Sequence, residues 1–198
     1  MPTDVLAILT TLGIAAVVYL VDSLYARSWL YVTKTTIIYV TAAILIGVFG
    51  EVLVETLYNS LFGLPLWHYQ VLPIHHTYTS LFSIVLWSLY GLHLYWVKAA
   101  IDKRLPDVGQ SQWKLALIFT FESLVLETFA NIVWLGVFGK LIFYYTPPDL
   151  WHVTTIQNIP CYFAASWAMT ATVKRFRRDI VFFPVMAACI ITVFMFFP

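Results

Sequence analysis

Three observations predict an all-α, polytopic membrane protein. Hydrophobic residues make up 61% of the 198 residues and charged residues only 11%, whereas a soluble domain carries about 25% charged residues. Six apolar stretches are each long enough to cross a bilayer as a helix, which takes about 20 residues. Few residues remain for connections, so we expect one transmembrane domain over residues 1–198.

The six predicted spans are Val5–Leu24, Ile37–Phe62, Thr79–Ala99, Trp113–Phe138, Thr154–Val173 and Ile180–Phe197. The residues before the first span, Met1–Asp4, lack the basic residues of a secretory signal, so we expect this span to be retained. The second and fourth spans are the polar ones. The first and sixth are apolar enough to face lipid, apart from Asp22 near the end of the first.

Basic residues predict the orientation of these spans. The connections after the first, third and fifth spans hold Arg27, Lys34, Lys98, Lys103, Arg104, Lys114, Lys174, Arg175, Arg177 and Arg178, whereas the opposite side holds only Lys140. Cytoplasmic loops carry the excess of Lys and Arg. We therefore expect both termini to be extracytoplasmic or lumenal. The apolar composition predicts membrane lipids as partners, and the net charge of +1 predicts no nucleic-acid partner.

All glutamates of the chain lie inside predicted spans, at Glu51, Glu55, Glu122 and Glu127. A carboxylate in hydrocarbon costs about 3 kcal/mol by insertion scales, and such residues are functional by default. Residues three and four apart share a helix face. Two polar stripes result. The stripe on the second span contains Glu51, Glu55 and Asn59, and the stripe on the fourth span contains Glu127 and Asn131. Glu122 lies about 140° around the helix from Glu127.

The second and fourth spans also predict an internal repeat. Both contain Glu-Thr-(Leu/Phe)-x-Asn, which begins at Glu55 in one and at Glu127 in the other. A glycine, an aromatic loop with proline and a histidine follow in each case, and His76 falls on His152 after an insertion of four residues. Spans two and three would then match spans four and five in a parallel repeat. Chance or a shared interfacial bias is the alternative.

Two longer segments, Gly63–Tyr78 and Gly139–Val153, lie on the side with little positive charge. They hold four of the five histidines and are rich in Trp, Tyr and Pro. An interfacial aromatic belt explains part of this composition. A cavity shared with the glutamates is the functional interpretation. The fifth histidine, His93, is isolated and is interpreted as a core residue.

The favoured hypothesis is an enzyme that acts on a lipophilic substrate by glutamate acid–base chemistry. Buried carboxyls can act as proton donors, and aromatic rings stabilise cationic intermediates. These requirements suit cyclisation, isomerisation or hydration of an isoprenoid, sterol or carotenoid-like substrate. The predicted catalytic residues are Glu55 and Glu127 as donor and base, Glu51 and Glu122 in support, Asn59 and Asn131 as orienting groups, and His76 and His152 as proton relays. The predicted substrate-binding residues are Trp67, Trp151, His75 and Tyr69.

Three alternatives stay open. Glutamates with His75, His76 and His152 could bind iron or zinc, although neither Glu-x-x-His nor HExxH occurs; the favoured hypothesis needs no metal or other cofactor. A small transporter of a solute, an ion or protons would also place polar residues near the midplane. Finally, buried polar side chains can simply join transmembrane helices. The sequence leaves the oligomeric state open.

One stretch carries a resemblance. The glutamate-bearing second span and the following Gly63–Tyr69 segment, Gly-Leu-Pro-Leu-Trp-His-Tyr, resemble polytopic carotenoid hydratases and cyclases, in which membrane glutamates precede a Gly/Pro/aromatic turn. The overall design is similar to that of small membrane-bound terpene cyclases with intramembrane acidic residues. The resemblance covers only this short stretch. It implies isoprenoid chemistry and assigns no family.

Overall fold

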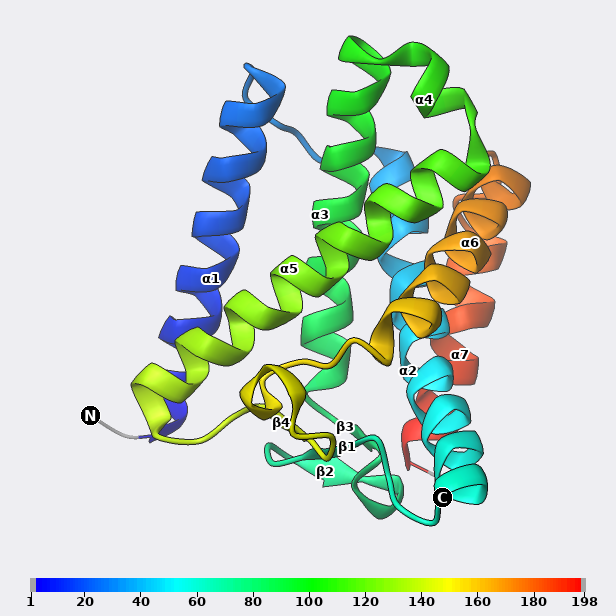
Figure 1. Ribbon diagram of the computed structural model, residues 1–198. Helices are drawn as coiled ribbons and strands as arrows, with labels where there is room; N and C mark the ends of the chain where they lie inside the picture. The colour runs from blue at the N-terminus through cyan, green and yellow to red at the C-terminus, as the bar shows by residue number, and fades with distance from the viewer. Residues whose placement is uncertain (1–2, 197–198) are drawn as a thin grey trace.

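The computed structural model describes residues 3–196, and these residues form mainly helices (Figure 1). The elements that run the length of the molecule are α1 (Thr3–Ala26), α2 (Lys34–Phe62), α3 (Ser83–Arg104), α5 (Gln112–Phe138), α6 (Asn158–Phe176) and α7 (Phe182–Phe196). A short helix, α4 (Pro106–Gln110), joins α3 to α5. The prediction of an all-α membrane protein is confirmed at this level.

Four of the helices, α1, α2, α3 and α5, are long and apolar enough to cross a membrane. The 19-residue α6 is less apolar and α7 has only 15 residues, so six spans remain an expectation. The predicted third and fifth spans begin too early, because Thr79–Ser80 forms a strand and Thr154–Gln157 forms a turn. Phe197, the predicted end of the sixth span, lies outside the described residues, as do Met1 and Pro2, which precede the first predicted span.

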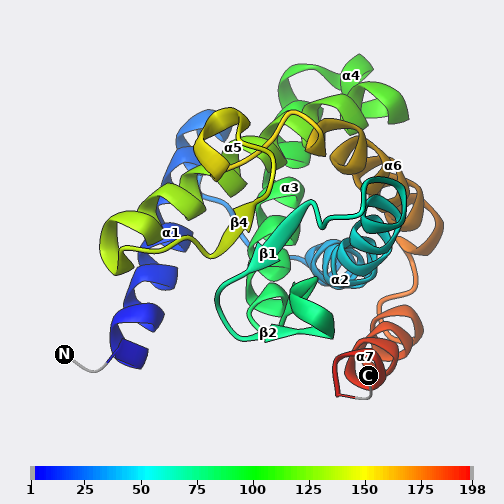
Figure 2. The same ribbon diagram turned by 60° about the horizontal axis from the view of Figure 1, so that its bottom comes forward.

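A small cap covers one end of the helices. It comprises residues 63–82 and 140–157, with the strands β1 (Trp67–Tyr69), β2 (Pro73–Ile74), β3 (Thr79–Ser80) and β4 (Phe143–Tyr145) and the short 3-10 turns η1 (His75–Thr77) and η2 (Asp149–His152). The strands β1 and β4 pair antiparallel, as do β2 and β3. Figure 2 shows how β1 and β4 bring together two loops that are far apart in the sequence.

Glycines end the two helices that lead into the cap. Gly63 after α2 and Gly139 after α5 have φ values of 72° and 67°, which a residue without Cβ adopts readily. Each donates its N–H to the carbonyl oxygen four residues earlier, at 2.8 Å. These left-handed terminations turn the chain back toward the helix that it has just left, so that β1 and β4 lie over the ends of α2 and α5.

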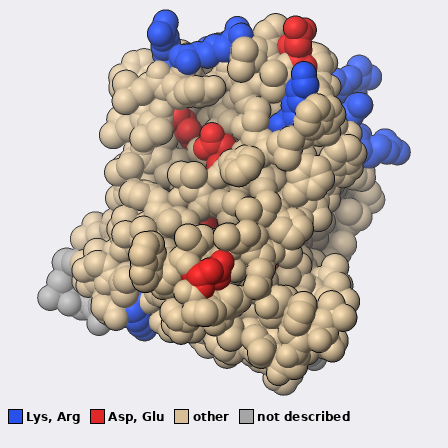
Figure 3. Space-filling view, in the orientation of Figure 1, with Lys and Arg blue, Asp and Glu red and all other residues tan. Residues whose placement is uncertain are grey.

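The two ends of the molecule differ in charge. Basic side chains gather at the end opposite the cap, and one lies at the cap end (Figure 3). The described chain begins and ends at the cap end (Figure 1). This distribution is the one that the sequence predicted for the loops.

Glycines also allow α2 and α3 to pack closely. A Cβ on Gly91 would lie 2.5 Å from the Cα of Val40, and one on Gly47 would overlap the ring of Trp87. Small residues at helix contacts let backbones approach within a membrane. The close α2–α3 packing carries Trp87 toward the polar stripe of α2.

Candidate active site

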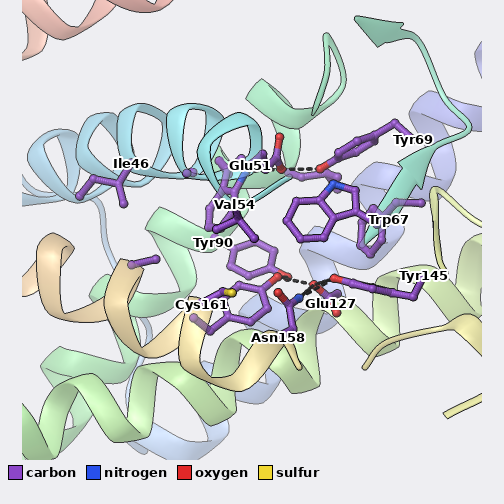
Figure 4. A pocket seen from close by; sticks show the side chains of 17 residues that line it. Ile46, Glu51, Val54, Trp67, Tyr69, Tyr90, Glu127, Tyr145, Asn158 and Cys161 are labelled. Carbon is purple, nitrogen blue, oxygen red and sulfur yellow. Dashed lines mark hydrogen bonds between the residues drawn. The ribbon is translucent and has the colours of Figure 1, made fainter. Parts of the chain in front are cut away.

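A cavity lies beneath the β1–β4 pair, between α2, α3, α5 and α6 (Figure 4). Its empty volume is about 590 Å³ with its open mouth included. Two carboxylates, from Glu51 and Glu127, face it, and no Lys, Arg or His side chain lines it. The aromatic residues in its wall are Trp67, Tyr69, Trp87, Tyr90, Phe143, Tyr145 and Tyr162.

Glu51 is 7% exposed and accepts hydrogen bonds from four side chains. The Tyr69 hydroxyl and the Trp87 indole N–H donate to Oε1, the latter at 2.8 Å. The Thr79 and Ser83 hydroxyls donate to Oε2, the latter at 3.1 Å. Strands β1 and β3 and helix α3 thus all supply donors to one carboxyl of α2.

Glu127 is 2% exposed and also accepts from four side chains. Its Oε2 accepts from the Tyr145 hydroxyl at 2.8 Å, from the Asn158 amide at 3.3 Å and from the Tyr162 hydroxyl. Its Oε1 accepts from Thr154 at 2.7 Å. Figure 4 shows Tyr69 pointing toward Glu51, and Tyr145 toward Glu127. Two similar carboxyl sites therefore share one cavity.

The two oxygens of each carboxyl differ in the type of hydrogen-bond donor that they contact. In both residues one oxygen accepts from an N–H group, of Trp87 or Asn158, which can only donate at that contact. The other oxygen has only hydroxyl partners, of Thr79 and Ser83 in one site and Thr154 in the other. A hydroxyl can rotate and accept instead. Glu51 and Glu127 can therefore each take up a proton on the oxygen with hydroxyl partners and lose no hydrogen bond.

Glu55 is placed differently from the sequence expectation. It is fully buried and does not line the cavity. Its two oxygens accept from the backbone N–H groups of Leu66, at 2.9 Å, and Trp67, at 2.6 Å. Because backbone amides cannot accept, protonation of Glu55 would cost one of these bonds. The structure therefore gives Glu55 the role of holding the start of β1 against α2, and gives Glu51 the cavity position.

Asn131 holds the start of β4 against α5, as Glu55 holds the start of β1 against α2. Its Oδ1 accepts from the N–H of Ile142 at 2.8 Å, and its Nδ2 donates to the carbonyl oxygens of Phe143 and Val153 at 2.8 and 2.9 Å. It is fully buried and does not line the cavity. The expectation that Asn131 orients a catalytic carboxyl is not what the geometry shows, since its partners are backbone groups. Asn59 is also separate, because its amide donates to the Tyr78 hydroxyl at 3.1 Å.

The predicted histidines do not contact the cavity glutamates. The Nδ1 of His152 lies 2.7 Å from the Tyr145 carbonyl oxygen, and the Nε2 of His75 lies 2.8 Å from the Phe194 carbonyl oxygen. His76 is exposed and its ring lies near Tyr78. None of them lines the cavity, so the expected proton relay through His76 and His152 finds no support in these contacts.

Of the aromatic residues predicted to bind substrate, two line the cavity and one does not. Trp67 and Tyr69 line the cavity as expected. Trp151 is 86% exposed and lies outside it. Trp151 is the central residue of three with positive φ in the turn that ends at His152, and this left-handed turn directs it outward. Glu122 also lies away from the cavity, within 3.4 Å of His93.

Sequence reasoning missed most donors of the two carboxyls. Each glutamate of the cavity has a tyrosine 18 residues later, Tyr69 after Glu51 and Tyr145 after Glu127, and this shared spacing is a signal that the sequence does contain. The hydroxyls of Thr79 and Thr154 carry no distinctive pattern. The two tyrosines lie in the cap, where burial and the neighbouring carboxylate raise the pKa of each hydroxyl well above its ordinary value. They therefore act as neutral hydrogen-bond donors.

Metal ligation has no support in this geometry. Among the described residues, no group of three or more His, Cys, Asp and Glu side chains is placed to hold a metal ion. Two of the histidines proposed as ligands have other partners: His152 contacts the Tyr145 carbonyl oxygen in the cap, and His75 contacts the Phe194 carbonyl oxygen in α7.

Comparison with known proteins identifies no relative: no family model, no curated protein and no solved structure matches the chain.

Proposed function

We propose that the protein is a membrane-embedded enzyme that acts on a lipophilic substrate by acid–base chemistry at Glu51 and Glu127. One observation carries this proposal: two buried carboxyls, each able to gain or lose a proton at an oxygen with hydroxyl partners, face a single aromatic cavity. General acid–base catalysis needs one group that donates a proton and one that accepts it.

The aromatic wall suggests what lies between these two steps. A protonated carboxyl would transfer its proton to an alkene carbon or an epoxide oxygen of the substrate and leave a cation. The aromatic residues Trp67, Trp87 and Tyr90 line the same space, and ring quadrupoles attract cations. The second carboxylate would then remove a proton, or water would add to the cation. The products would be those of cyclisation, isomerisation or hydration of an isoprenoid, sterol or carotenoid-like lipid.

Substrate entry is proposed from the lipid, between α2 and α6. The lining residues that these helices contribute include the small Gly50, Cys161 and Ala165. Small side chains leave room for a lipid chain to pass between the two helices. Such a path suits a substrate that is dissolved in the membrane and never enters water.

An internal repeat is also proposed, in a register that differs from the one that sequence identity suggested. Glu51 matches Glu127, since each accepts from a tyrosine 18 residues later and precedes a left-handed glycine by 12 residues. Glu55 then matches Asn131, because both accept from backbone N–H groups 11 and 12 residues later. The centre of the β1–β4 pair, where His68 faces Tyr144, joins residues with the same separation of 76. The cavity would lie on the two-fold axis of a parallel repeat.

For the orientation, we propose that the basic end faces the cytoplasm. The cap, with both termini, would then lie on the extracytoplasmic or lumenal side. Helices α6 and α7 would complete six crossings. The oligomeric state stays open in this proposal.

Transport of a lipophilic cation is the second candidate function. It is favoured by one observation, that the cavity has two acidic side chains and no basic one. An amine with an apolar body would pair with the carboxylates and pack against the rings. Uptake of such a cation into proteoliposomes, without chemical change, would identify a carrier.

The experiment for the enzyme proposal uses a lipophilic tertiary amine, which mimics a cationic intermediate, and its neutral isostere with carbon in place of nitrogen. Tryptophan fluorescence of the purified protein would report binding. We expect the amine to bind at least tenfold more tightly, and Glu51→Gln and Glu127→Gln to abolish this preference. Glu122→Gln, outside the cavity, is the matched control. Equal binding of the two probes, or preference retained in both variants, would contradict the proposal. Mass spectrometry of lipids extracted with the protein would then identify substrates to test for conversion.

A further inference from the structure

A second group of ionisable side chains lies between α1, α3 and α5. His93 on α3 is its centre: Nδ1 lies 2.9 Å from Asp22 Oδ2 on α1, and Nε2 lies 3.4 Å from Glu122 Oε2 on α5. None of these three residues lines the cavity. All three lie in helices that are long and apolar enough to cross a membrane.

The two nitrogens of His93 have different surroundings. The Nδ1 contact with Asp22 is a hydrogen bond. The Nε2 contact with Glu122 is close enough for an ion pair but not aligned as a hydrogen bond, so that Nε2 is buried without a hydrogen-bond partner. When the ring is neutral and Nδ1–H donates to Asp22, Nε2 carries a lone pair and no proton. His93 itself is only 7% exposed.

The charges of Asp22, His93 and Glu122, called the triad below, do not cancel. One imidazolium neutralises one of two carboxylates, and a remaining charge in hydrocarbon costs about 3 kcal/mol. Asp22 is buried, whereas the Glu122 side chain is 40% exposed. Figure 3 shows acidic groups on an otherwise uncharged flank of the molecule. Of the two carboxyls, Glu122, which has no aligned hydrogen bond to His93, is therefore the one that bears the uncompensated charge, and a bound proton would remove this charge.

We propose that Asp22, His93 and Glu122 form a proton-binding site inside the membrane, in which Glu122 exchanges the proton and the His93–Asp22 pair holds the compensating charges. The ligand is a proton that comes from the basic end of the molecule. Asp22 is four residues from the end of α1, about 6 Å along the helix axis, and Glu122 is ten residues from the start of α5, about 15 Å. The triad thus leads inward from that end.

This site is independent of the cavity chemistry. The nearest cavity residue on the same face of α3 is Tyr90, one turn from His93. Its hydroxyl donates to the Ser123 carbonyl oxygen at 3.1 Å and lies 3.4 Å from the Tyr162 hydroxyl. No hydrogen bond between described residues joins the triad to Glu51 or Glu127. A cavity that proves not to be catalytic would leave the proton-binding site unaffected, and the reverse also holds.

Infrared difference spectra of the full-length protein in detergent, recorded between alkaline and acidic pH, test the proposal. We expect a pH-dependent carboxylic-acid C=O band that Glu122→Gln removes. His93→Gln removes the neighbouring cation, so at a fixed pH the ratio of acid to carboxylate in this band should rise about tenfold or more, because a nearby cation favours the carboxylate form. His152→Gln, whose ring contacts the Tyr145 carbonyl oxygen and the Tyr144 ring in the cap, is the control and should leave the band unchanged.

Two results would overturn the proposal: spectra of Glu122→Gln that match wild type at every pH, or a Glu122 band that His93→Gln leaves unaltered. Gel filtration and thermal unfolding establish that each variant is folded. Should His93→Gln fail to fold, Asp22→Asn replaces it, with ¹⁵N-histidine NMR as the readout. The protonated fraction of His93 at a fixed pH should then fall, and an unchanged fraction would equally refute the site.

Discussion

Replacement of each buried glutamate by glutamine should separate the structural carboxyl from the cavity carboxyls. Glutamine keeps the shape but turns one acceptor oxygen into an NH2 donor. At Glu55 both oxygens accept from backbone N–H groups, so the new NH2 must face an amide that cannot accept. One backbone N–H is then left buried and unpaired, which costs about 1–3 kcal/mol. Glu55→Ala would leave both N–H groups unpaired and cost about 2–6 kcal/mol.

The same replacement should be tolerated at the cavity carboxyls. In Glu51→Gln the NH2 can lie at the Oε2 position, where the Thr79 and Ser83 hydroxyls rotate to accept. In Glu127→Gln it can lie at the Oε1 position, opposite Thr154. We expect both variants to lie within about 1 kcal/mol of wild type, which is in the range of ordinary substitutions.

The assay is equilibrium unfolding in mixed micelles, followed by circular dichroism. The order of stability expected is wild type, then Glu51→Gln and Glu127→Gln together, then Glu55→Gln, then Glu55→Ala. A Glu55→Gln variant as stable as wild type would refute the hydrogen-bond reasoning. If that variant also lost binding of the lipophilic amine, the catalytic role that the sequence predicted for Glu55 would be restored.

Three further predictions follow from single contacts. Burial raises the pKa of Tyr69 and Tyr145 in the folded protein. The stability that their neutral forms contribute is therefore complete below about pH 10, the pKa of tyrosine in the unfolded chain, and is lost as the pH rises beyond that value. The midpoint of thermal unfolding should fall above that pH, and an unchanged midpoint would contradict this prediction. Gly91→Ala places a Cβ against the backbone of Val40 and should cost about 1–3 kcal/mol, measured by the same unfolding assay; an unaffected variant would show that α2 and α3 can separate freely. Trp151→Ala should leave stability and amine binding unchanged because the side chain is exposed, and a loss of binding would place it in the site.

The helices could be predicted because apolar length alone determines where a chain can cross a bilayer. The cap could not, since its strands have two or three residues each and no alternating pattern long enough to detect. That omission also hid the donors of the two carboxyls. Tyr69 and Tyr145 were part of aromatic segments that an interfacial belt explains equally well, until β1 and β4 placed them over the cavity.

The repeat register that we propose differs from the one that sequence identity suggested, and the difference has a specific cause. Matching by identity aligned Glu55-Thr56 with Glu127-Thr128, but in the fold a carboxylate at Glu55 and an amide at Asn131 serve the same purpose, because each offers an oxygen to two backbone N–H groups. The equivalence is one of acceptor role and not of residue type. The sequence offers no signal for it, since it depends on which backbone amides the two glycine turns bring back to the helix.

The β1–β4 pair explains why both carboxyl sites have the same design. Side chains alternate across a strand, and in both strands the first and third residues are buried while the middle one is partly exposed. Pairing of His68 with Tyr144 at the centre therefore sends Tyr69 and Tyr145 to the cavity side, each 18 residues after a glutamate on the helix that precedes its strand. A slip of either strand by one residue would turn the tyrosine of that strand away from its carboxyl. The register of three residue pairs thus determines which hydroxyls reach Glu51 and Glu127, and a substitution that disturbs it should affect a carboxyl site even though it touches neither glutamate.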